Sequence, residues 1–177
     1  MISFKANFIS SAQINRISTN TPVKASFVEL SPFCDEDIKS IQEISKNWEA
    51  DRSFASNIKH NIQDCNWIGY SNCRRFFALT LQRDKFEKLD PDEVLGLTQI
   101  IEGGSDRIKI KYLQTDPINK YQASDREFSG IGTSILDSLK KLFSKDFILE
   151  STPSAKNFYK KYGFERVKKT RDFILKR

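Results

Sequence analysis

Cysteine and histidine are scarce in this chain, which limits the kinds of site that it can build. Its 177 residues include three cysteines and one histidine, His60. The cysteines, Cys34, Cys65 and Cys73, are odd in number and lack the spacing of metal ligands. A zinc site and a cysteine–histidine nucleophile are therefore poorly supported. We expect reduced thiols in a reducing compartment and no bound metal.

Long apolar runs are absent as well. No stretch reaches the roughly 18 apolar residues of a membrane span, and the N-terminus lacks the apolar core of a secretory signal. Fourteen phenylalanines and a hydrophobic content of 38% nevertheless indicate a folded globular protein. We expect a cytoplasmic protein without a membrane partner. A single domain is predicted over residues 23–177. Residues 1–22, which are serine-rich and free of acidic residues, are predicted to form an N-terminal extension or edge strand rather than a leader sequence.

Basic residues are concentrated near the C-terminus. The formal net charge is +6, and from Lys156 onward only Glu165 and Asp172 oppose the lysines and arginines. Such a surface would suit a polyanion, either a nucleic acid or the phosphates of a nucleotide cofactor. A solvated surface that aids solubility is the plainer interpretation, because no aromatic residues alternate with the basic ones as in a single-strand groove.

Hydrophobic periodicity predicts an α/β domain with a mixed sheet. Strands are expected over residues 24–31, 74–82, 93–101, 107–115, 146–151 and 164–176, and helices over 31–50, 51–64, 131–143 and 153–163. Gly103 and Gly104 predict an antiparallel hairpin between two of the strands. Asp35 or Ser31 is expected to cap the first helix.

Two glycines, Gly130 and Gly132, stand where the third helix is expected to begin. A dinucleotide fingerprint would need glycine at position 135, which is Ile135, and a P-loop would need lysine in place of Thr133. Both motifs fail. The physical features of an anion site remain, because glycine lets a ligand approach the backbone and a helix N-terminus offers free N–H groups.

Three motifs follow one another in this part of the chain. They are Leu113-Gln114-Thr115-Asp116-Pro117, the segment from Glu127 to Gly132, and the segment from Ala155 to Phe164. They match the patterns L-x-V-x-P, Q/R-x-x-G-x-G/A and A-x-x-x-Y-x-x-x-G-F, so residues 93–167 resemble the GNAT superfamily of acyl-CoA-dependent N-acyltransferases. The resemblance implies a GNAT-like fold with a mixed, mostly antiparallel central sheet that is flanked by helices on both faces.

The resemblance also implies a site for acetyl-CoA as cosubstrate. The strand backbone at Leu113 to Thr115 would pair with pantetheine, and amides at 128–133 would hold the pyrophosphate. The implied cofactor-binding residues are Leu113, Gln114, Thr115, Arg126, Phe128, Ser129, Gly130, Ile131, Gly132, Thr133 and Thr152. Tyr159 takes the position of the general acid that protonates the CoA thiolate, and Tyr162 is a competing candidate.

Two residues depart from the family pattern at the implied cofactor site. Glu127 replaces the usual glutamine or arginine, and its carboxylate would repel a pyrophosphate unless it points away or Arg126 compensates it. Thr152 stands where many members have asparagine, so a hydroxyl replaces a side-chain amide.

No general base stands out. The strand over 107–115 lacks the glutamate of some members, which leaves Glu102, Glu150, Asp116 or a chain of water molecules to take the proton of the amine.

The function implied is transfer of an acetyl group from acetyl-CoA to a primary amine by direct attack on the thioester. The acceptor is a small molecule, a protein amine or an aminoacyl-tRNA, and the basic C-terminal segment favours an acceptor with phosphates. Two rivals stay open: a non-catalytic CoA-binding module, and a nucleic-acid-binding protein that acts through residues 156–177. A monomer or a homodimer is expected.

Overall fold

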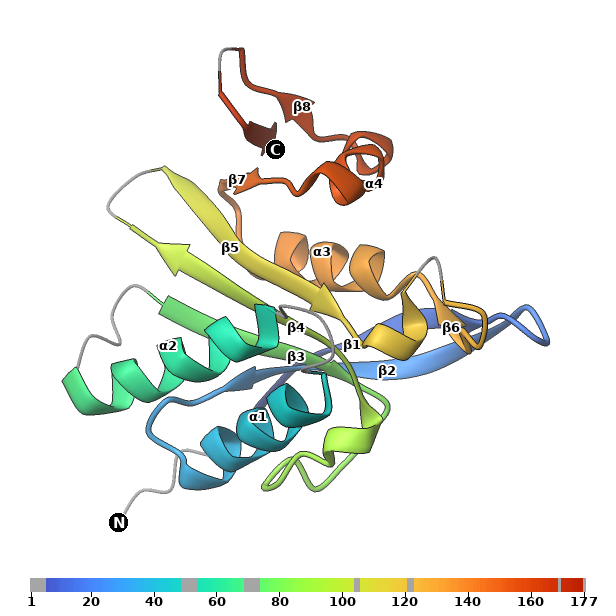
Figure 1. Cartoon of the computed structure of the whole chain (residues 1–177), viewed down its shortest axis with the longest axis vertical. Helices are drawn as coiled ribbons and strands as arrows, with labels where there is room; N and C mark the ends of the chain where they lie inside the picture. The colour runs from blue at the N-terminus through green and yellow to red at the C-terminus, as the bar shows by residue number, and fades with distance from the viewer. Residues whose placement is uncertain are drawn as a thin grey trace.

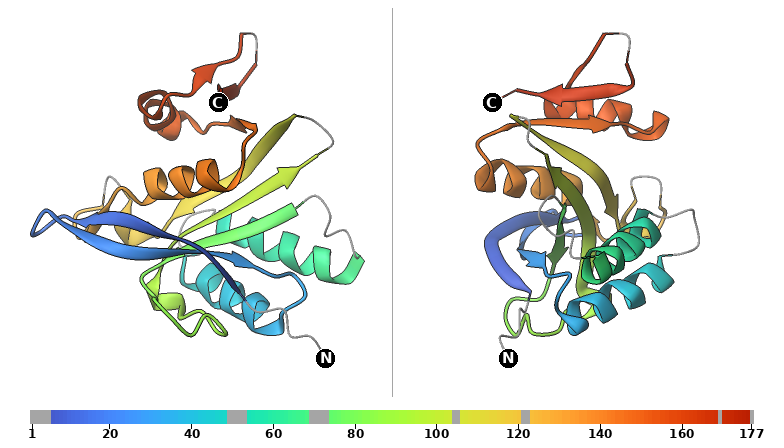
Figure 2. Two further views of the ribbon diagram at one scale, coloured as in Figure 1. Left: turned by 180° about the vertical axis from the view of Figure 1, so that it is seen from behind. Right: turned by 90° about the vertical axis from the view of Figure 1, so that its left-hand side faces the viewer.

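The computed structural model describes residues 6–48, 54–68, 74–103, 106–120, 123–168 and 170–176. Cys73 and Gly104, named in the sequence predictions, lie outside these ranges. Within them the chain forms one nine-stranded sheet with helices on both faces (Figures 1 and 2).

The elements follow one another in a mixed order. The strands are β1 (Asn7–Arg16), β2 (Thr21–Leu30), β3 (Arg74–Thr80), β4 (Val94–Glu102), β5 (Arg107–Thr115), β6 (Phe128–Ser129), β7 (Asp146–Glu150), β8 (Glu165–Arg166) and β9 (Asp172–Leu175). The helices are α1 (Asp35–Asn47), α2 (Phe54–Ile68), α3 (Ile131–Leu142) and α4 (Lys156–Tyr162), with short 3-10 turns at Pro91–Glu93, Pro117–Asn119 and Pro153–Ala155.

The sheet is mixed and mostly antiparallel. Its strand order is β6-β1-β2-β3-β4-β5-β7-β9-β8. Among the described strands only β5 and β7 pair in parallel, and the other neighbours are antiparallel. The predicted fold class is therefore confirmed.

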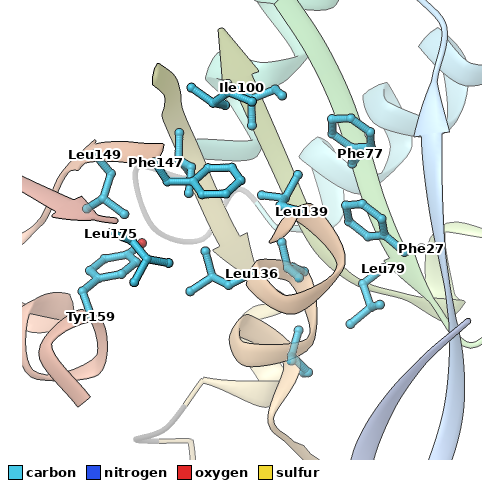
Figure 3. Close-up of a cluster of buried hydrophobic side chains, with 14 of the residues drawn as sticks. Phe27, Phe77, Leu79, Ile100, Leu136, Leu139, Phe147, Leu149, Tyr159 and Leu175 are labelled. Atoms are coloured by element: carbon cyan, nitrogen blue, oxygen red, sulfur yellow. The ribbon is translucent and has the colours of Figure 1, made fainter. Parts of the chain in front are cut away.

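The buried side chains divide into two clusters, one on each face of the sheet. Along β3, Phe76 and Ala78 pack towards α1 and α2, whereas Phe77 and Leu79 pack towards α3 (Figure 3). This division follows from strand geometry, because successive side chains point to opposite faces. The apolar stripes predicted on the helices supply the other half of each cluster.

The start of α1 differs from the prediction. The residue before the helix is Cys34, which makes no capping hydrogen bond with its side chain, so neither Asp35 nor Ser31 caps α1 as expected. Ser31 is used locally instead: its Oγ accepts from Phe33 N–H at 3.2 Å, and its own N–H donates to Asp37 Oδ2 at 2.8 Å.

The closing strand predicted over 164–176 is also wrong, since it is interrupted. A turn separates β8 from β9, and in it Asp172 N–H donates to Thr170 Oγ1 at 3.1 Å. Val167 N–H donates to Asp172 O at 2.9 Å and closes the hairpin. The turn contains neither glycine nor proline, the residues that mark most turns in a sequence.

The fifth strand separates from the seventh halfway along its length. β5 pairs with β4 throughout, but with β7 only from Arg107 to Ile110. The register with β4 shifts at this point, because Ile100 lies opposite Ile110 while Gln99 lies opposite Tyr112. Lys111 is therefore the extra residue of a β-bulge, which bends a strand locally. Beyond it β5 and β7 diverge (Figure 1).

Candidate functional site

The first turn of α3 presents backbone N–H groups without helical partners. Gly130 precedes the helix with φ of 81° and no side-chain cap, a conformation that favours glycine. The first helical hydrogen bond runs from Ser134 N–H to Gly130 O at 2.8 Å. The N–H groups of Ile131, Gly132 and Thr133 therefore have no acceptor within the helix, as at every uncapped helix start.

The same turn lies against the end of β5. A β-carbon at Gly96 of β4 would lie 3.1 Å from Ile131 Cγ2 and 3.3 Å from Gln114 O. Gly96 pairs with Thr115, the last residue of β5. The free amides of α3 and the diverging part of β5 therefore meet at one place.

Gly132 has a packing role in this arrangement. A β-carbon at position 132 would lie 2.9 Å from Phe158 Cζ of α4. A second contact joins the same two helices, since Tyr162 donates its hydroxyl to Asp137 Oδ1 at 2.6 Å. The close approach of Phe158 explains the second glycine of the motif without a ligand.

The loop before α3 already uses some of the amides that the motif assigned to the pyrophosphate. Phe128 N–H donates to Asn119 Oδ1 at 2.8 Å, and the Phe128 ring is buried. Ser129 is paired with Asn15 of β1. The Phe128 ring is therefore part of the core, and its amide is not free to bind a ligand. The candidate anion cradle is limited to the backbone N–H groups of residues Gly130 through Thr133.

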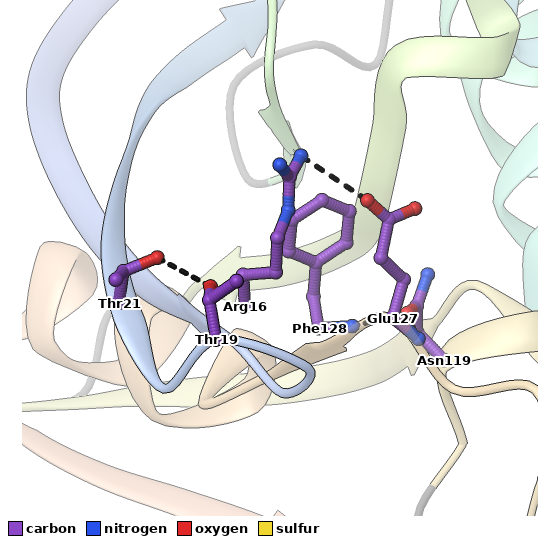
Figure 4. A network of polar contacts seen from close by, with 6 residues as sticks. All are labelled: Arg16, Thr19, Thr21, Asn119, Glu127 and Phe128. Atoms are coloured by element: carbon purple, nitrogen blue, oxygen red, sulfur yellow. Dashed lines mark hydrogen bonds and ion pairs between the residues drawn. The ribbon is translucent and has the colours of Figure 1, made fainter.

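The unusual carboxylate of Glu127 has a partner on a distant strand. Arg16 of β1 lies 3.2 Å from Glu127 Oε1, and its guanidinium stands 5.5 Å from the centre of the Phe128 ring (Figure 4). Arg126, the expected compensating residue, donates from Nε to Phe128 O at 2.9 Å instead. No sequence motif pointed to Arg16, which lies more than a hundred residues away along the chain.

The outer edge of β5 is open where a pantetheine arm was predicted. Asp116 N–H donates to Leu95 O at 2.8 Å, which places the peptide groups of Gln114 and Asp116 on the β4 side. Because these groups alternate along a strand, those of Leu113 and Thr115 point to the opposite edge. No described strand pairs with that edge beyond Ile110, where the pairing with β7 ends.

Two of the predicted cofactor residues have side chains with local partners. Gln114 Oε1 accepts from Ala55 N–H at 2.9 Å and so holds the start of α2. Thr152 is exposed between β7 and α4, with its Oγ1 3.3 Å from Ser154 Oγ. The Gln114 side chain is thus engaged and its peptide groups face β4, whereas Thr152 is exposed to solvent.

Two tyrosines were candidates for the general acid, and the structure separates them. Tyr159 is 7% exposed, and its ring centre lies 5.1 Å from that of Phe158 and 5.5 Å from that of Phe164. Burial raises the pKa of Tyr159 to about 12. Its hydroxyl makes no hydrogen bond to any of the described residues, and Figure 3 shows the side chain beside Leu175. The Tyr162 hydroxyl, in contrast, is engaged with a carboxylate.

Two of the candidate bases are occupied by structural contacts. Glu102 lies 3.5 Å from Arg75, which also holds Glu29 through two hydrogen bonds of 2.6 and 2.9 Å. Asp116 accepts from Asn119 Nδ2 at 3.0 Å through one oxygen and from the N–H of residue 118 through the other.

Glu150 is the third carboxylate and stands where β5 and β7 separate. It directly follows Leu149, whose pairing with Ile110 is the last between the two strands. Its side chain is exposed, and its nearest ion-pair partner is Arg171 at 4.0 Å. Of the three carboxylates, Glu150 therefore has the loosest contact among the described residues, and it follows the last residue at which β7 pairs with β5.

The described ranges contain no cluster of three or more histidine, cysteine, aspartate or glutamate residues that could hold a metal ion. None of the helices in the described part of the chain is long and apolar enough to cross a membrane. His60 is exposed, and its Nδ1 lies 2.7 Å from Ser56 O.

Comparison with known proteins identifies the architecture. No protein-family model matches the sequence, and no curated protein does. Among solved structures, a protein from Desulfovibrio desulfuricans assigned to the GNAT family of acetyltransferases matches with a TM-score of 0.59 at 11% identity, covering 86% of this chain and 98% of its own. The PaiA N-acetyltransferase of Thermoplasma acidophilum, in complex with coenzyme A, matches at 0.53 and 15%, covering 85% and 96%.

A third structure is AtaT complexed with acetyl-methionyl-tRNA. It has a TM-score of 0.53 and 15% identity over 86% of this chain and 94% of its own. At such identities the likeness shows the fold, and the chain has the fold of the GNAT acetyltransferases.

Proposed function

We propose that this chain, on its GNAT fold, is an N-acetyltransferase that moves an acetyl group from acetyl-CoA to a primary amine. One observation carries the proposal. The uncapped first turn of α3 lies beside the part of β5 that no longer pairs with β7. A candidate anion site therefore adjoins an open strand edge. Acyl-CoA would use both, because its pyrophosphate is joined directly to an arm that contains two amide groups.

Different residues of this chain would bind different parts of acetyl-CoA. The N–H groups from Gly130 to Thr133 hold the pyrophosphate, helped by the positive end of the helix dipole. The backbone of Leu113 and Thr115 pairs with the amides of the pantetheine arm as an added strand does. Arg126, Ser129 and Thr152 are proposed to contact the cosubstrate through their side chains, while Gln114, Phe128 and Ile131 hold the surrounding backbone in place.

The proposed chemistry is a direct transfer. The amine attacks the thioester carbonyl carbon, the C–S bond breaks, and the sulfur leaves as a thiolate that must be stabilised or protonated. Tyr159 is the proposed donor. Its pKa of about 12 keeps the hydroxyl protonated. A thiol has a pKa of roughly 8.5, so Tyr159 acts mainly by donating a hydrogen bond to the developing thiolate.

The proton that the amine loses needs an acceptor on the other side of the thioester. Of the three carboxylates considered, Glu150 is the one with the loosest contact, since Glu102 and Asp116 are held by the partners described above. We assign this step to Glu150 or to water ordered beside it.

The basic C-terminal surface favours an acceptor that carries phosphate. It consists of the exposed residues Lys156, Lys160, Lys161, Arg166, Lys168, Arg171 and Lys176 on α4 and the β8–β9 hairpin. Only Glu165 and Asp172 oppose them within the same segment. This positive surface would attract the phosphates of such an acceptor at long range and so bring its amine towards the site. That AtaT was solved with acetyl-methionyl-tRNA makes an RNA-linked amine the first acceptor to test.

The first experiment is calorimetric binding of CoA to the wild type and to two variants of Thr133. Thr133 is exposed in the first turn of α3. Thr133→Asp places a carboxylate at the cradle, where it favours the helix but repels a pyrophosphate. Thr133→Asn is the neutral control of similar shape. We expect the aspartate variant to lose at least about tenfold in affinity at an unchanged melting temperature, while the asparagine variant binds almost normally. No binding by the wild type would overturn the proposal.

A second candidate function is nucleic-acid binding without acetyl transfer, and the same basic surface supports it. It requires RNA or DNA binding that weakens steeply with salt and ignores CoA. Titration of a short RNA at two salt concentrations, with and without CoA, separates the two. Binding of RNA by a protein that never binds CoA would favour the second candidate.

A further inference from the structure

One buried side chain organises the loop in front of the proposed cradle. Asn119 is 7% exposed and stands at the end of the turn that follows β5. Its Oδ1 accepts from Glu127 N–H at 3.1 Å and from Phe128 N–H at 2.8 Å. Its Nδ2 donates to Asp116 Oδ2 at 3.0 Å. A single amide thereby ties the end of β5 to the start of the segment that leads into α3.

Asp116 completes this connection. Its other carboxylate oxygen, Oδ1, accepts from Ile118 N–H at 3.1 Å, and its own N–H donates to Leu95 of β4. Asp116 is therefore fixed to the sheet on one side and to Asn119 on the other. Buried, hydrogen-bonded amides of this kind hold a single local geometry, because breaking the contacts leaves polar groups unsatisfied.

The connection also decides which amides stay free. Two consecutive N–H groups, those of Glu127 and Phe128, point to Asn119 and are withdrawn from any ligand. The next residue, Ser129, pairs with Asn15 of β1, and its peptide groups face that strand because Ile17 N–H donates to Glu127 O two residues earlier. The first N–H that a ligand can take is thus that of Gly130, where the backbone turns into its left-handed conformation.

We infer that Asn119 is a positioning residue for the cosubstrate. Its hydrogen bonds make Gly130 the first residue with a free N–H group, and they hold the start of α3 close to the end of β5. The inference rests on the proposed function. It assigns to Asn119 an effect on pyrophosphate binding that is exerted through the backbone, without contact with the ligand.

The test compares CoA and ADP binding by calorimetry in the wild type, Asn119→Ala and Asn47→Ala. ADP carries the pyrophosphate without the pantetheine arm, and Asn47 is an exposed asparagine at the end of α1. We expect Asn119→Ala to lose about tenfold or more in affinity for both ligands, as the loss of two or more hydrogen bonds implies. Asn47→Ala should bind as the wild type does. A merely structural role would instead lower the melting temperature and leave the affinity of the folded fraction unchanged.

An exchange variant keeps the inference testable should Asn119→Ala not fold. Asp116→Asn combined with Asn119→Asp can reproduce all four hydrogen bonds with the same total charge, because the carboxylate accepts both N–H groups and the new amide donates to it. We expect Asn119→Asp alone to weaken CoA binding and the exchange to restore it to within about threefold of the wild type.

Amide hydrogen exchange supplies a readout that needs no ligand. The N–H groups of residues 127 and 128 should be protected in the free wild type and exposed in Asn119→Ala. Fast exchange of both amides in the wild type would overturn the inference, as would CoA binding by Asn119→Ala within twofold of the wild type. Absence of CoA binding by the wild type would overturn the proposed function together with the inference, and is distinguishable from the first two results.

Discussion

Arg16 and Glu127 form an ion pair across a sequence separation of 111 residues, with Arg16 lying over the ring of Phe128. Glu127 stands three residues before the amides proposed to hold a pyrophosphate. The pair neutralises a carboxylate that would otherwise repel the ligand. β1 thus contributes a charge to a site that is built mostly from the second half of the chain.

Removing the arginine tests this compensation. We expect Arg16→Gln to weaken CoA binding by about threefold to tenfold, because an unpaired carboxylate remains near the pyrophosphate. Glu127→Gln should bind as well as the wild type or better, and the double variant should match Glu127→Gln. Stability should change by less than about 1 kcal/mol, since the pair is exposed. Calorimetry at low and high salt checks this, and equal binding by Arg16→Gln and the wild type contradicts it.

The contact between Gly132 and Phe158 predicts a coupled effect on stability. Gly132→Ala should destabilise the fold by about 1–3 kcal/mol, because the new methyl group would overlap a ring that is packed between two helices. Phe158→Leu makes room for it, so the double variant should lose less than the sum of the single variants. Urea unfolding measures all three, with Lys141→Ala on the exposed side of α3 as the control. Simple additivity would show that the two side chains do not meet.

A buried carboxylate predicts a pH dependence of stability. Asp37 is 0% exposed, accepts from Ser31 N–H through Oδ2 at 2.8 Å, and its Oδ1 has no hydrogen-bond partner among the described residues. Burial raises its pKa from 3.8 to about 7. The folded state therefore binds a proton that the unfolded state has already lost, and the stabilisation that is complete below about pH 4 disappears as the pH rises to about 7.

Asp37→Asn removes this titration. Between about pH 4 and 7 the wild type should lose up to about 4 kcal/mol of unfolding free energy relative to Asp37→Asn, at roughly 1.4 kcal/mol for each pKa unit. Thermal unfolding at several pH values gives the comparison. Parallel curves for the two proteins over this range would show that the carboxyl titrates normally.

Tyr159 predicts opposite effects on activity and stability. Tyr159→Phe removes a hydroxyl that has no partner among the described residues, so stability should be unchanged or slightly higher. Acetyl transfer to any amine that the wild type accepts should fall by about 100-fold if the hydroxyl assists the thiolate. Tyr162→Phe should have a much smaller effect on transfer.

The pH profile gives a second readout on Tyr159. Because its pKa is raised to about 12, its ionisation should produce no loss of activity below about pH 11. Its ionisation does not affect stability below about pH 10, and wild-type stability should fall relative to Tyr159→Phe as the pH rises from about 10 through 12. If the rates of the wild type and of Tyr159→Phe both fell in the same way near pH 9, a group other than Tyr159 would control the pH dependence.

The sequence predicted the features that depend on neighbouring residues. The start of α3 at Ile131 and the strands over 74–82 and 107–115 follow from local pattern or from a motif of fixed spacing. The turn between β8 and β9 was missed because Thr170 and Asp172 form it without glycine or proline.

Long-range partners could not be predicted in this way. Arg16 and Glu127 meet only because β1 pairs with β6, and that pairing depends on the whole sheet. Asn119 is one asparagine in a polar loop, and its role becomes clear only from its hydrogen bond with Phe128 N–H in the structure. Such contacts require the coordinates, because the residue types that form them are common in any loop.

The division of the buried side chains into two clusters has a consequence for how this protein can change over evolution. The cluster under α1 and α2 and the cluster under α3 and α4 share no side chain, and the sheet separates them. Substitutions in one should therefore add to substitutions in the other with little interaction. Selection can thus vary the two N-terminal helices, and with them the surface open to a new partner, while the layer that supports α3 keeps its sequence.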